Sequence, residues 1–347
     1  MTARWIELGD PAWNEALAGL DHDVYHLAEW TEAEAGLVGG TGRAFSYQDG
    51  SAMVFLPLVF RPIPGTDLVD ATSTFGYPGP LTNVEDADTV QTALGSLHRA
   101  LLDAGAVSAF VRGHPLVGVG AEPLEPWGTV VQHGETVAID VQQTEEEIWR
   151  WVKRDHRSDI NRARREDMTA RIDHDWDRVD DFLTVYRETM DRVHAAGTYF
   201  FPREYFLDLK ERLGSRVQLW LVETGDGEVA SAGLFTQVDG IVQFHLSGTA
   251  DAHLRFSPSK LMIAEVWRSA RELGQRVFHL GGGVGASDDS LFTFKSRFSN
   301  WRLPFHTWRV IVRPETYEEL TNGESADDDF FPAYRRTLGA GEDVKEA

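Results

Sequence analysis

A lysine within an apolar stretch is the residue of this chain best suited to polar chemistry. Residues 291–298 read LFTFKSRF, and Lys295 lies there among apolar and small neighbours. An ammonium group partly removed from water acts strongly on a developing negative charge. We therefore expect partial burial of Lys295 and a focused field around its charge. The alternative is an ordinary surface lysine on a strand.

Other polar residues flank this stretch. Asp288 and Asp289 lie in a glycine-rich loop, which we expect to precede the strand that carries Lys295. They could hold an ammonium or a substrate amine, or act as turn and capping residues. His245 and His279 lie in the apolar strands QFHLSG and VFHLGG, where a hydrogen-bonded core histidine is more usual than a base. His245 remains a candidate for substrate binding, and no strong general-base motif is present.

A basic segment stands out from an acidic chain. Residues 150–171 carry eight Lys and Arg residues against four Asp and Glu residues, a net +4, whereas the whole protein carries −22. A cationic patch of this kind attracts RNA phosphates. The candidate RNA-binding residues are Lys153, Arg154, Arg157, Arg162, Arg164 and Arg165. The alternative is a solvated helix face with pairs such as Asp159 and Arg162.

Composition limits the class of protein. The chain has 347 residues, 42% of them hydrophobic, which suffices for a sizeable core and suggests two domains. Cysteine is absent, which excludes disulfides, thiolate metal sites and a cysteine nucleophile. We find no metal-binding pattern, Walker loop or dinucleotide motif, and no apolar run of bilayer length. The sequence therefore predicts a soluble, cytoplasmic protein without a metal or a bound cofactor.

The second half of the chain predicts an ordered set of elements. Residues 145–168 have helical composition, and 178–193 and 202–213 are also predicted helices. Strands are predicted at 216–223 and in the two segments that follow Asp-Gly turns. A helix from Pro258 and a short strand at 277–283 complete the set. We expect Ser257 and Ser259 to cap this helix.

The first half shows weak self-similarity to the second. Residues 52–60 and 68–80 read as strands, 88–105 as a helix that ends at Gly105, and 107–113 as the next strand. The same order in both halves favours a tandem duplication of one α/β unit of about 150 residues over two unrelated domains. We predict domains at 1–140 and 141–312, and a C-terminal segment at 313–347 with a flexible acidic tail.

This order of elements resembles the GNAT N-acetyltransferase fold, and two such units resemble the Fem-type aminoacyltransferases. The likeness rests mainly on INRARRE (160–166), on Tyr186, Thr189 and Arg192, and on HLGGG with DSLFTFKSRFSN (279–300). The resemblance implies an α/β fold of two tandem GNAT-like domains, each a mixed, mostly antiparallel sheet flanked by helices. It also implies transfer of an amino acid from aminoacyl-tRNA to an amine, with Lys295 and Phe294 as the catalytic pair.

The resemblance suggests where an acceptor would bind. Arg192 corresponds to a family position that contacts the acceptor's phosphate or carboxylate; a surface arginine at a helix end is the alternative. Tyr77 in FGYPGPL, and Arg112 and His114 in RGHPL, end strands of the first domain and are candidate substrate-binding residues, unless they only pack loops. Trp30 is followed by TEAE rather than by a basic residue, which disfavours a nucleotide-linked cell-wall acceptor. A small amine or a peptide is favoured instead.

The donor is expected to be aminoacyl-tRNA. An acyl-CoA enzyme of this fold would bind pyrophosphate with backbone N–H groups of a glycine-rich loop at a helix start. The corresponding residues 249–260 read TADAHLRFSPSK, in which Pro258 lacks an N–H. Two alternatives remain: an acyl-CoA-dependent N-acyltransferase with an altered loop, and a tandem domain that only binds a ligand.

Overall fold

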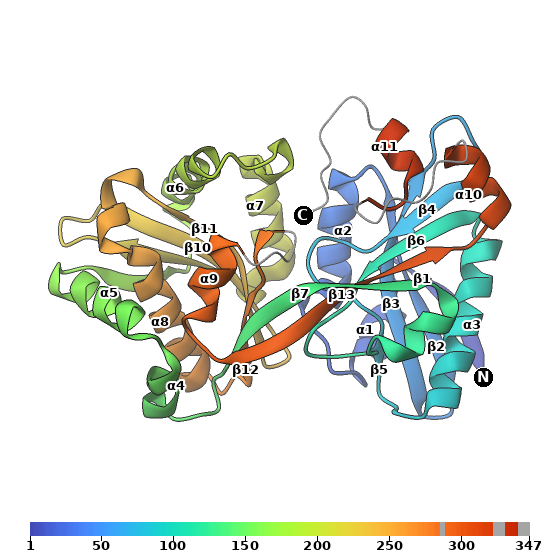
Figure 1. The fold of residues 1–347 in the computed structure, drawn as a ribbon, viewed down its shortest axis with the longest axis horizontal. Helices are drawn as coiled ribbons and strands as arrows, with labels where there is room; N and C mark the ends of the chain where they lie inside the picture. Colours follow the sequence, from blue (N-terminus) through green and yellow to red (C-terminus); the bar gives the residue numbers. More distant parts are fainter. Residues whose placement is uncertain (285–288, 322–329, 339–347) are drawn as a thin grey trace. The chain divides into compact units, whose positions relative to one another are not determined.

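The chain folds into two compact units. The computed structural model describes residues 1–284, 289–321 and 330–338. The first unit holds residues 1–134 and the described residues from 304 onward, and the second holds residues 135–303 (Figure 1). The predicted boundary at residue 312 therefore differs from the observed division, because residues 307–311 pair with a strand of the first unit. The predicted acidic tail, 339–347, lies outside the described residues.

The first unit is a mixed sheet with helices. Its strands follow the order β1-β2-β3-β4-β6-β13, and β5 pairs with β3. All pairs are antiparallel except β4 with β6. The strands are β1 (Thr2–Glu7), β2 (Thr41–Asp49), β3 (Ala52–Pro62), β4 (Val69–Thr72), β5 (Leu81–Thr82), β6 (Ala106–Arg112) and β13 (Trp301–Ile311). The helices are α1 (Ala12–Leu17), η1 (Val24–His26), α2 (Ala28–Leu37), α3 (Ala87–Asp103), η2 (Glu122–Trp127), α10 (Pro314–Thr321) and α11 (Tyr334–Leu338).

The second unit repeats this plan. Its strands follow the order β8-β9-β10-β11-β12-β7, and only β11 and β12 are parallel. The strands are β7 (Thr129–Asp140), β8 (Thr169–Asp173), β9 (Val217–Glu223), β10 (Val229–Val238), β11 (Ile241–Thr249) and β12 (Val277–Gly281). The helices are α4 (Glu145–Trp151), α5 (Arg154–Arg165), α6 (Val179–Arg192), η3 (Gly197–Tyr199), α7 (Arg203–Leu213), η4 (Gly214–Arg216), η5 (Asp251–Phe256), α8 (Pro258–Glu272) and α9 (Ser290–Ser296).

The two halves match element by element. Apart from the two-residue β5, which has no counterpart, a strand, two α-helices, three strands, a helix and a strand run from β1 to β6, and the same order runs from β8 to β12. The strand that follows each set completes the other sheet: the C-terminal part of β7 pairs with β12, and β13 pairs with β6. This agreement in order, pairing and direction supports the predicted duplication. The mixed, mostly antiparallel sheets flanked by helices confirm the predicted fold class.

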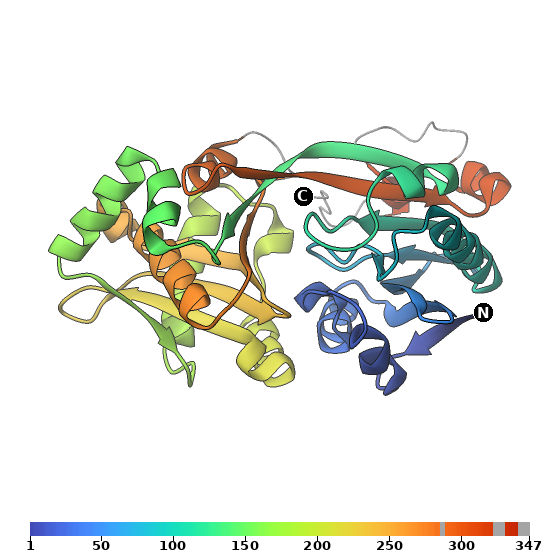
Figure 2. The ribbon, with the colours of Figure 1, turned by 90° about the horizontal axis from the view of Figure 1, so that it is seen from below.

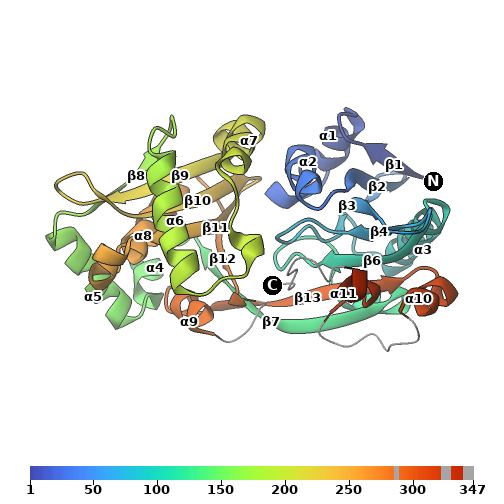
Figure 3. The ribbon, with the colours of Figure 1, turned by 90° about the horizontal axis from the view of Figure 1, so that it is seen from above.

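Helices cover both faces of the second sheet. A Cβ on Gly248 of β11 would meet the carbonyl oxygen of Val185 in α6 at 2.3 Å, so α6 lies directly on the strand. Gly233, on the opposite face of β10, abuts Met262 of α8. Figure 3 shows α6 crossing β9, β10 and β11, with α8 on the far side. The core of this unit also includes Ile160 of α5. Helix α5, green in Figure 2, packs beside α8, which is orange.

The predicted basic helix 145–168 is two helices. A capping box of Thr144 and Glu147 starts α4, and the backbone then turns extended at Val152 and Lys153 before α5 begins. Val152 is buried, and the Lys153 N–H donates to the carbonyl of Arg297 at 2.8 Å. These tertiary contacts override the helical propensity of the segment. No helix among the described residues is long and apolar enough to span a bilayer.

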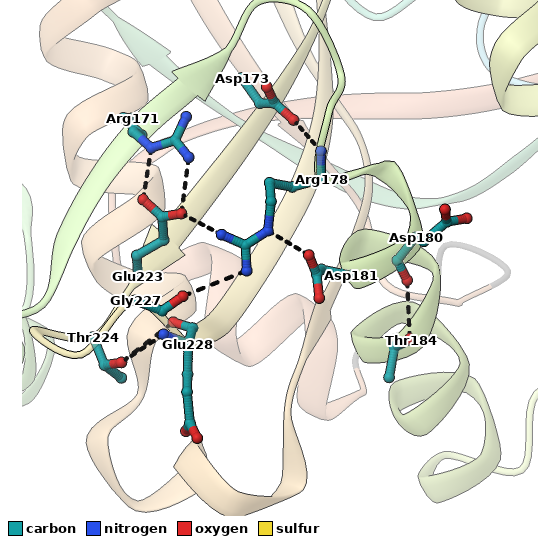
Figure 4. A network of polar contacts seen from close by, with 10 residues as sticks. All are labelled: Arg171, Asp173, Arg178, Asp180, Asp181, Thr184, Glu223, Thr224, Gly227 and Glu228. Carbon is teal, nitrogen blue, oxygen red and sulfur yellow. Dashed lines mark hydrogen bonds and ion pairs between the residues drawn. The ribbon is translucent and has the colours of Figure 1, made fainter.

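An ion-pair network fixes the start of α6 to the sheet edge (Figure 4). Arg171 of β8 binds both carboxylate oxygens of Glu223 in β9, at 2.6 and 2.8 Å. Arg178 donates to the same carboxylate at 3.0 Å and also pairs with Asp181 of α6. The hydrogen bond from Arg171 lowers the pKa of Glu223 below its usual value. The network therefore holds β8, β9 and α6 together.

We expect Glu223→Gln to lower the free energy of unfolding at pH 7 by roughly 1 kcal/mol, because two arginines lose a shared, largely buried carboxylate. Since the folded state lowers the pKa of Glu223, this contribution is present above the unfolded pKa and is lost as the pH falls through the folded one. Urea unfolding at pH 7 and pH 3 measures both effects. Glu146→Gln, at an exposed pair, is the control. Equal stability of wild type and Glu223→Gln at pH 7 would contradict this role.

Candidate functional site

The parallel strands of the second unit stop pairing early. β11 and β12 pair from Ile241 with Val277 to Gln243 with His279, although β11 continues to Thr249. The last pair is tied by its side chains, because His279 Nδ1 bonds Gln243 Oε1 and His279 Nε2 bonds Thr136 Oγ1, both at 2.8 Å. Ligands of α/β proteins bind beyond the carboxyl ends of parallel strands. The segment after Gln243 is therefore a candidate site, and His279 has a structural role there.

A β-bulge lies at this point. Leu246 pairs with Leu234 and Phe244 with Phe235, so His245 is the extra residue of β11. Bulges redirect side chains and are common beside active sites. Burial lowers the pKa of His245 to about 4, so its ring is neutral at pH 7. A neutral imidazole can hydrogen-bond a substrate there, consistent with the role expected for this residue.

Lys295 extends its amine to the same place. The residue is only 7% exposed, and Nζ donates to the carbonyl of Gly282 at 2.6 Å, just after β12. Nζ also lies 5.4 Å from the ring centroid of Phe244. Burial lowers the pKa of Lys295 to about 7, opposed by the negative charge of Asp289. The amine is thus a buried, titratable group at the point where β11 and β12 separate, in the environment expected from its apolar neighbours.

The element that carries Lys295 is a helix, contrary to the expected strand. Asp289 begins α9 as its N-cap: Oδ1 accepts from the Phe292 N–H at 2.8 Å and Oδ2 from the Val284 N–H at 3.0 Å. This cap satisfies backbone donors and so favours the helix. Of the two roles considered for Asp289, the geometry shows capping. Asp288 lies outside the described residues.

The first part of the basic segment is bonded to α9. His156 of α5 is buried, and its Nε2 donates to the carbonyl of Phe294 at 3.1 Å. Its ring also lies 5.5 Å from that of Phe294, and Asp155 pairs with Arg297 at 2.9 Å. Phe294 thus packs in the core between α5 and Phe298. These contacts therefore hold α5, the cationic helix, against α9, the lysine helix that carries Lys295.

The six basic candidates differ in their surroundings. Arg162 pairs with Asp159 at 2.9 Å, and Arg164 pairs with Glu265 at 2.7 Å. Arg157 donates to the Trp149 carbonyl at 3.4 Å. Within the described residues, Lys153, Arg154 and Arg165 form no ion pair, and all three are exposed. The last two lie eleven positions apart on one exposed face of α5. The predicted phosphate contacts therefore remain open to these three residues, whereas Arg162 and Arg164 are engaged by carboxylates.

Arg192 lies at the end of α6, next to the end of β11. Its guanidinium donates to Thr189 Oγ1 at 2.9 Å and to the Thr249 carbonyl at 3.4 Å, and it pairs with Asp251. Thr189 Oγ1 in turn accepts from the Thr249 N–H at 2.9 Å. Arg192 thus joins α6 to β11. An acceptor carboxylate or phosphate would have to compete with Asp251 for it.

The candidates of the first unit lie around the matching parallel pair, β4 and β6. His114 uses both ring nitrogens, since Nε2 donates to Asp23 at 3.0 Å and Nδ1 accepts from the N–H groups of Leu116 and Val117. That arrangement is structural, as is the packing of the Arg112 guanidinium 4.9 Å from the Phe110 ring centroid. The partly exposed Tyr77 packs edge-on against the rings of Tyr25, His114 and Phe305.

The start of α8 differs from a phosphate-binding loop. The short 3-10 helix η5 leads into it, and Ser257 has a left-handed φ of 52°. Pro258 is the first helical residue, and the Lys260 N–H donates to the Ser257 carbonyl at 3.0 Å. Ser257 occupies the N-cap position but forms no side-chain capping bond, so its expected capping role is wrong. Its left-handed backbone explains this, because N-caps that hydrogen-bond are usually extended.

Comparisons with known proteins agree with this fold. Residues 151–295 match the family model described as "Acetyltransferase (GNAT) domain". The structure of FemX aligns with a TM-score of 0.72 and 13% identity, over 91% of this chain and 99% of that one. L-PGS from Bacillus licheniformis aligns with a TM-score of 0.55 and 13% identity, over 87% and 92%.

A third neighbour is the C-terminal domain of a putative lysylphosphatidylglycerol synthetase from Agrobacterium fabrum. Its TM-score is 0.55 at 15% identity, over 94% of this chain and 96% of that one. No curated protein matches the chain. The chain therefore resembles the Fem-type enzymes in fold, as predicted, and the comparisons support an acyltransferase of the GNAT fold.

Sequence reasoning missed several residues of this site. Phe244 and Gly282 contact the lysine amine, and His156 links α5 to α9. The alternation of polar and apolar residues in QFHLSG does not reveal the bulge at His245. The run of glycines after β12 is the sequence feature that could have indicated Gly282. Among the described residues, no cluster of His, Asp or Glu could hold a metal ion.

We expect the stability difference between Lys295→Met and wild type to depend on pH. Because burial lowers the pKa of Lys295 from 10.5 to about 7, only the unfolded chain holds the proton between these values. The stability of the wild type therefore rises with pH in this range, and that of the variant does not. The free energy of unfolding of Lys295→Met, relative to that of the wild type, should therefore fall by more than about 2 kcal/mol from pH 6 to pH 10. Urea unfolding measures it, with exposed Lys153→Met as the control; a constant difference for Lys295→Met would refute the buried amine.

Proposed function

We propose that the protein is an aminoacyltransferase that moves an aminoacyl group from aminoacyl-tRNA to the amine of a small molecule or peptide, in a natural-product or cell-wall pathway. The observation that carries the proposal is the buried amine of Lys295 where β11 and β12 stop pairing. This position is suited to a reacting carbonyl, because a charge in a dry site acts strongly on an oxyanion.

The reaction needs little from the protein beyond this charge. The neutral acceptor amine attacks the ester carbonyl carbon, and the carbonyl oxygen becomes an oxyanion. An ammonium has three N–H donors, and Lys295 uses one of them on Gly282, so others remain for the oxyanion. The bond from carbon to the ribose oxygen then breaks, and the proton released by the attacking nitrogen goes to that oxygen. The products are an amide and the free tRNA end.

Two features favour tRNA as the donor. The start of α8 lacks the glycine pattern that would hold the pyrophosphate of coenzyme A, and Pro258 supplies no N–H there. Arg154 and Arg165 form an exposed cationic face on a helix that is bonded to the lysine helix. Positive charge on such a face favours RNA phosphates even in a protein of net charge −22. The likeness to FemX and to L-PGS agrees with this donor.

The second candidate is an acyl-CoA-dependent N-acyltransferase. The description of the matched family, an acetyltransferase domain, favours it. A non-catalytic ligand-binding protein is the third reading. The buried amine of Lys295, with a pKa lowered to about 7, favours catalysis over it, because such titratable groups cluster at catalytic sites. Acyl transfer therefore remains the common element of the two leading candidates.

Transfer from a pool of tRNA charged with labelled amino acids, with a host metabolite extract as acceptor, tests the donor. Label should move to a small molecule or peptide, and ribonuclease should abolish the transfer. An acyl-CoA panel runs in parallel. Release of free coenzyme A without any transfer from tRNA would replace the proposal by the second candidate.

Lys295→Ala should lower kcat by about 100- to 1,000-fold, because one oxyanion-stabilising group of this kind contributes that much. Circular dichroism checks that the variant is folded. Lys210→Ala, at a half-buried lysine of α7 that donates to the Asp175 carbonyl, is the control and should keep wild-type activity. Full activity of Lys295→Ala would remove the lysine from the mechanism under either donor.

The double variant Arg154→Glu with Arg165→Glu should weaken tRNA binding and lower the slope of log affinity against log salt by about one to two. Neither residue has an ion-pair partner among the described residues, so the fold should be kept. The matched control is Arg4→Glu with Arg187→Glu, the same charge change at exposed positions of β1 and α6. If both double variants change the salt slope equally, α5 is not the tRNA-binding face.

A further inference from the structure

A small aromatic pocket lies beside the first cationic residues. It has a volume of about 170 Å³, and all its walls belong to the second unit. α4, the end of β7 and the loop after α9 supply those walls. The lining residues are Ile139, Asp140, Gln143, Ile148, Trp151, Phe298, Ser299, Asn300 and Trp301. The reaction proposed above uses none of them.

One wall of the pocket is an exposed indole. Trp151 ends α4 and is 44% exposed, although large aromatic side chains are usually buried. The neighbouring residues on both sides are held in place: Ile148 and Val152 are buried, and the Trp149 carbonyl accepts from Arg157. The exposure of Trp151 is therefore not the result of a loosely attached segment.

Another wall is a turn held by hydrogen bonds to an arginine. Arg302 donates to the carbonyls of Ser299 at 2.9 Å and Trp301 at 3.2 Å, and its other nitrogen donates to that of Ser296 at 2.9 Å. The hydroxyl of Ser299 accepts from the Trp301 N–H at 3.1 Å. A pocket with fixed walls loses little entropy when a ligand enters.

Charge around the pocket indicates the kind of ligand. Lys153 and Arg154 follow Trp151 almost directly, are exposed, and form no ion pair with described residues. The Lys153 N–H is bonded to the Arg297 carbonyl, which fixes the backbone that carries these cations beside the pocket. An aromatic wall next to cations is the arrangement by which proteins bind single-stranded nucleic acid, with bases on the rings and phosphates on the cations.

We propose that this pocket binds one unpaired base of an RNA strand, stacked on Trp151, with the adjoining phosphates on Lys153 and Arg154. The proposal rests on the tRNA-dependent function above and adds to it a contact with the single-stranded end of the tRNA. The volume admits one base rather than several. The carboxylate oxygens of Asp140 lie at the wall, where each already accepts one bond, from the Gln142 N–H at 3.0 Å and from Gln143 Nε2 at 3.2 Å. Each oxygen keeps a second lone pair for an exocyclic amino group, so the pocket favours bases that carry one over uracil.

Binding of fluorescein-labelled tetranucleotides ACCA and UUUU to the intact protein, followed by anisotropy, tests the pocket. Trp151→Ala should weaken ACCA binding about 5- to 100-fold, and Trp151→Phe, which keeps a ring, by less than about 5-fold. The salt slope should stay unchanged in both, whereas Lys153→Ala with Arg154→Ala should lower it. Leu273→Ala, a second exposed apolar residue, is the control.

Several outcomes would overturn the proposal. Equal affinity of Trp151→Ala and wild type for ACCA would overturn the stacking on Trp151. Equal binding of ACCA and UUUU by the wild type would overturn the base preference. Binding of a Trp-containing peptide amide, with no binding of ACCA, would assign the pocket to a peptide instead. If transfer from tRNA proceeds with an unchanged KM in Trp151→Ala, the pocket proposal fails and the proposed function stands. If coenzyme A proves to be the donor while ACCA still binds through Trp151, the proposed function fails and the pocket proposal stands.

Discussion

The buried amine of Lys295 is the constraint on which the candidate site depends. An ammonium inside a protein is costly unless it has hydrogen-bond partners or a use for its charge. Here one carbonyl, that of Gly282, and one aromatic ring, that of Phe244, surround it. Both become available because the parallel pairing of β11 and β12 ends at Gln243 and His279. The bulge at His245, the cap at Asp289 and the contact of α5 with α9 all lie around this point.

The exchange of final strands explains how each unit is completed. Without β7, the parallel strand β12 would form an edge of its sheet. Its backbone N–H and C=O groups on that edge would then be unpaired, and exposed edges of this kind are prone to aggregate. The C-terminal part of β7 pairs with it, and β13 does the same for β6. The cost is a set of contacts far apart in sequence, which slows folding. The result is two sheets of the same plan, each with its parallel pair in the interior.

Local patterns predicted much of this fold, and tertiary contacts decided the rest. The Asp-Gly turns, the alternation of 216–223 and the glycines after 88–105 and 258–273 located strands and helices correctly, because turn chemistry acts over a few residues. The division of 145–168 at Lys153 depends on the Arg297 carbonyl, more than a hundred residues away. The helix at Ser290 depends on the side chain of Asp289, and the place of β13 depends on β6. Likewise, Lys295 was identifiable from the Phe-Lys pair of the family resemblance and from its apolar neighbours. Phe244 and Trp151 were not, since nothing in their own segments indicates a contact with the amine or with the pocket.

The most direct test of the account is the pKa of Lys295 itself, measured by NMR on protein with ¹³Cε-labelled lysine. The chain has only five lysines, and loss of one resonance in Lys295→Met assigns it. We predict that this resonance titrates near pH 7, well below the ordinary lysine value of 10.5. It should also shift when charged tRNA is added. A Lys295 resonance that titrates near 10.5 and does not respond to charged tRNA would contradict the buried, charge-stabilising amine on which the proposed chemistry depends.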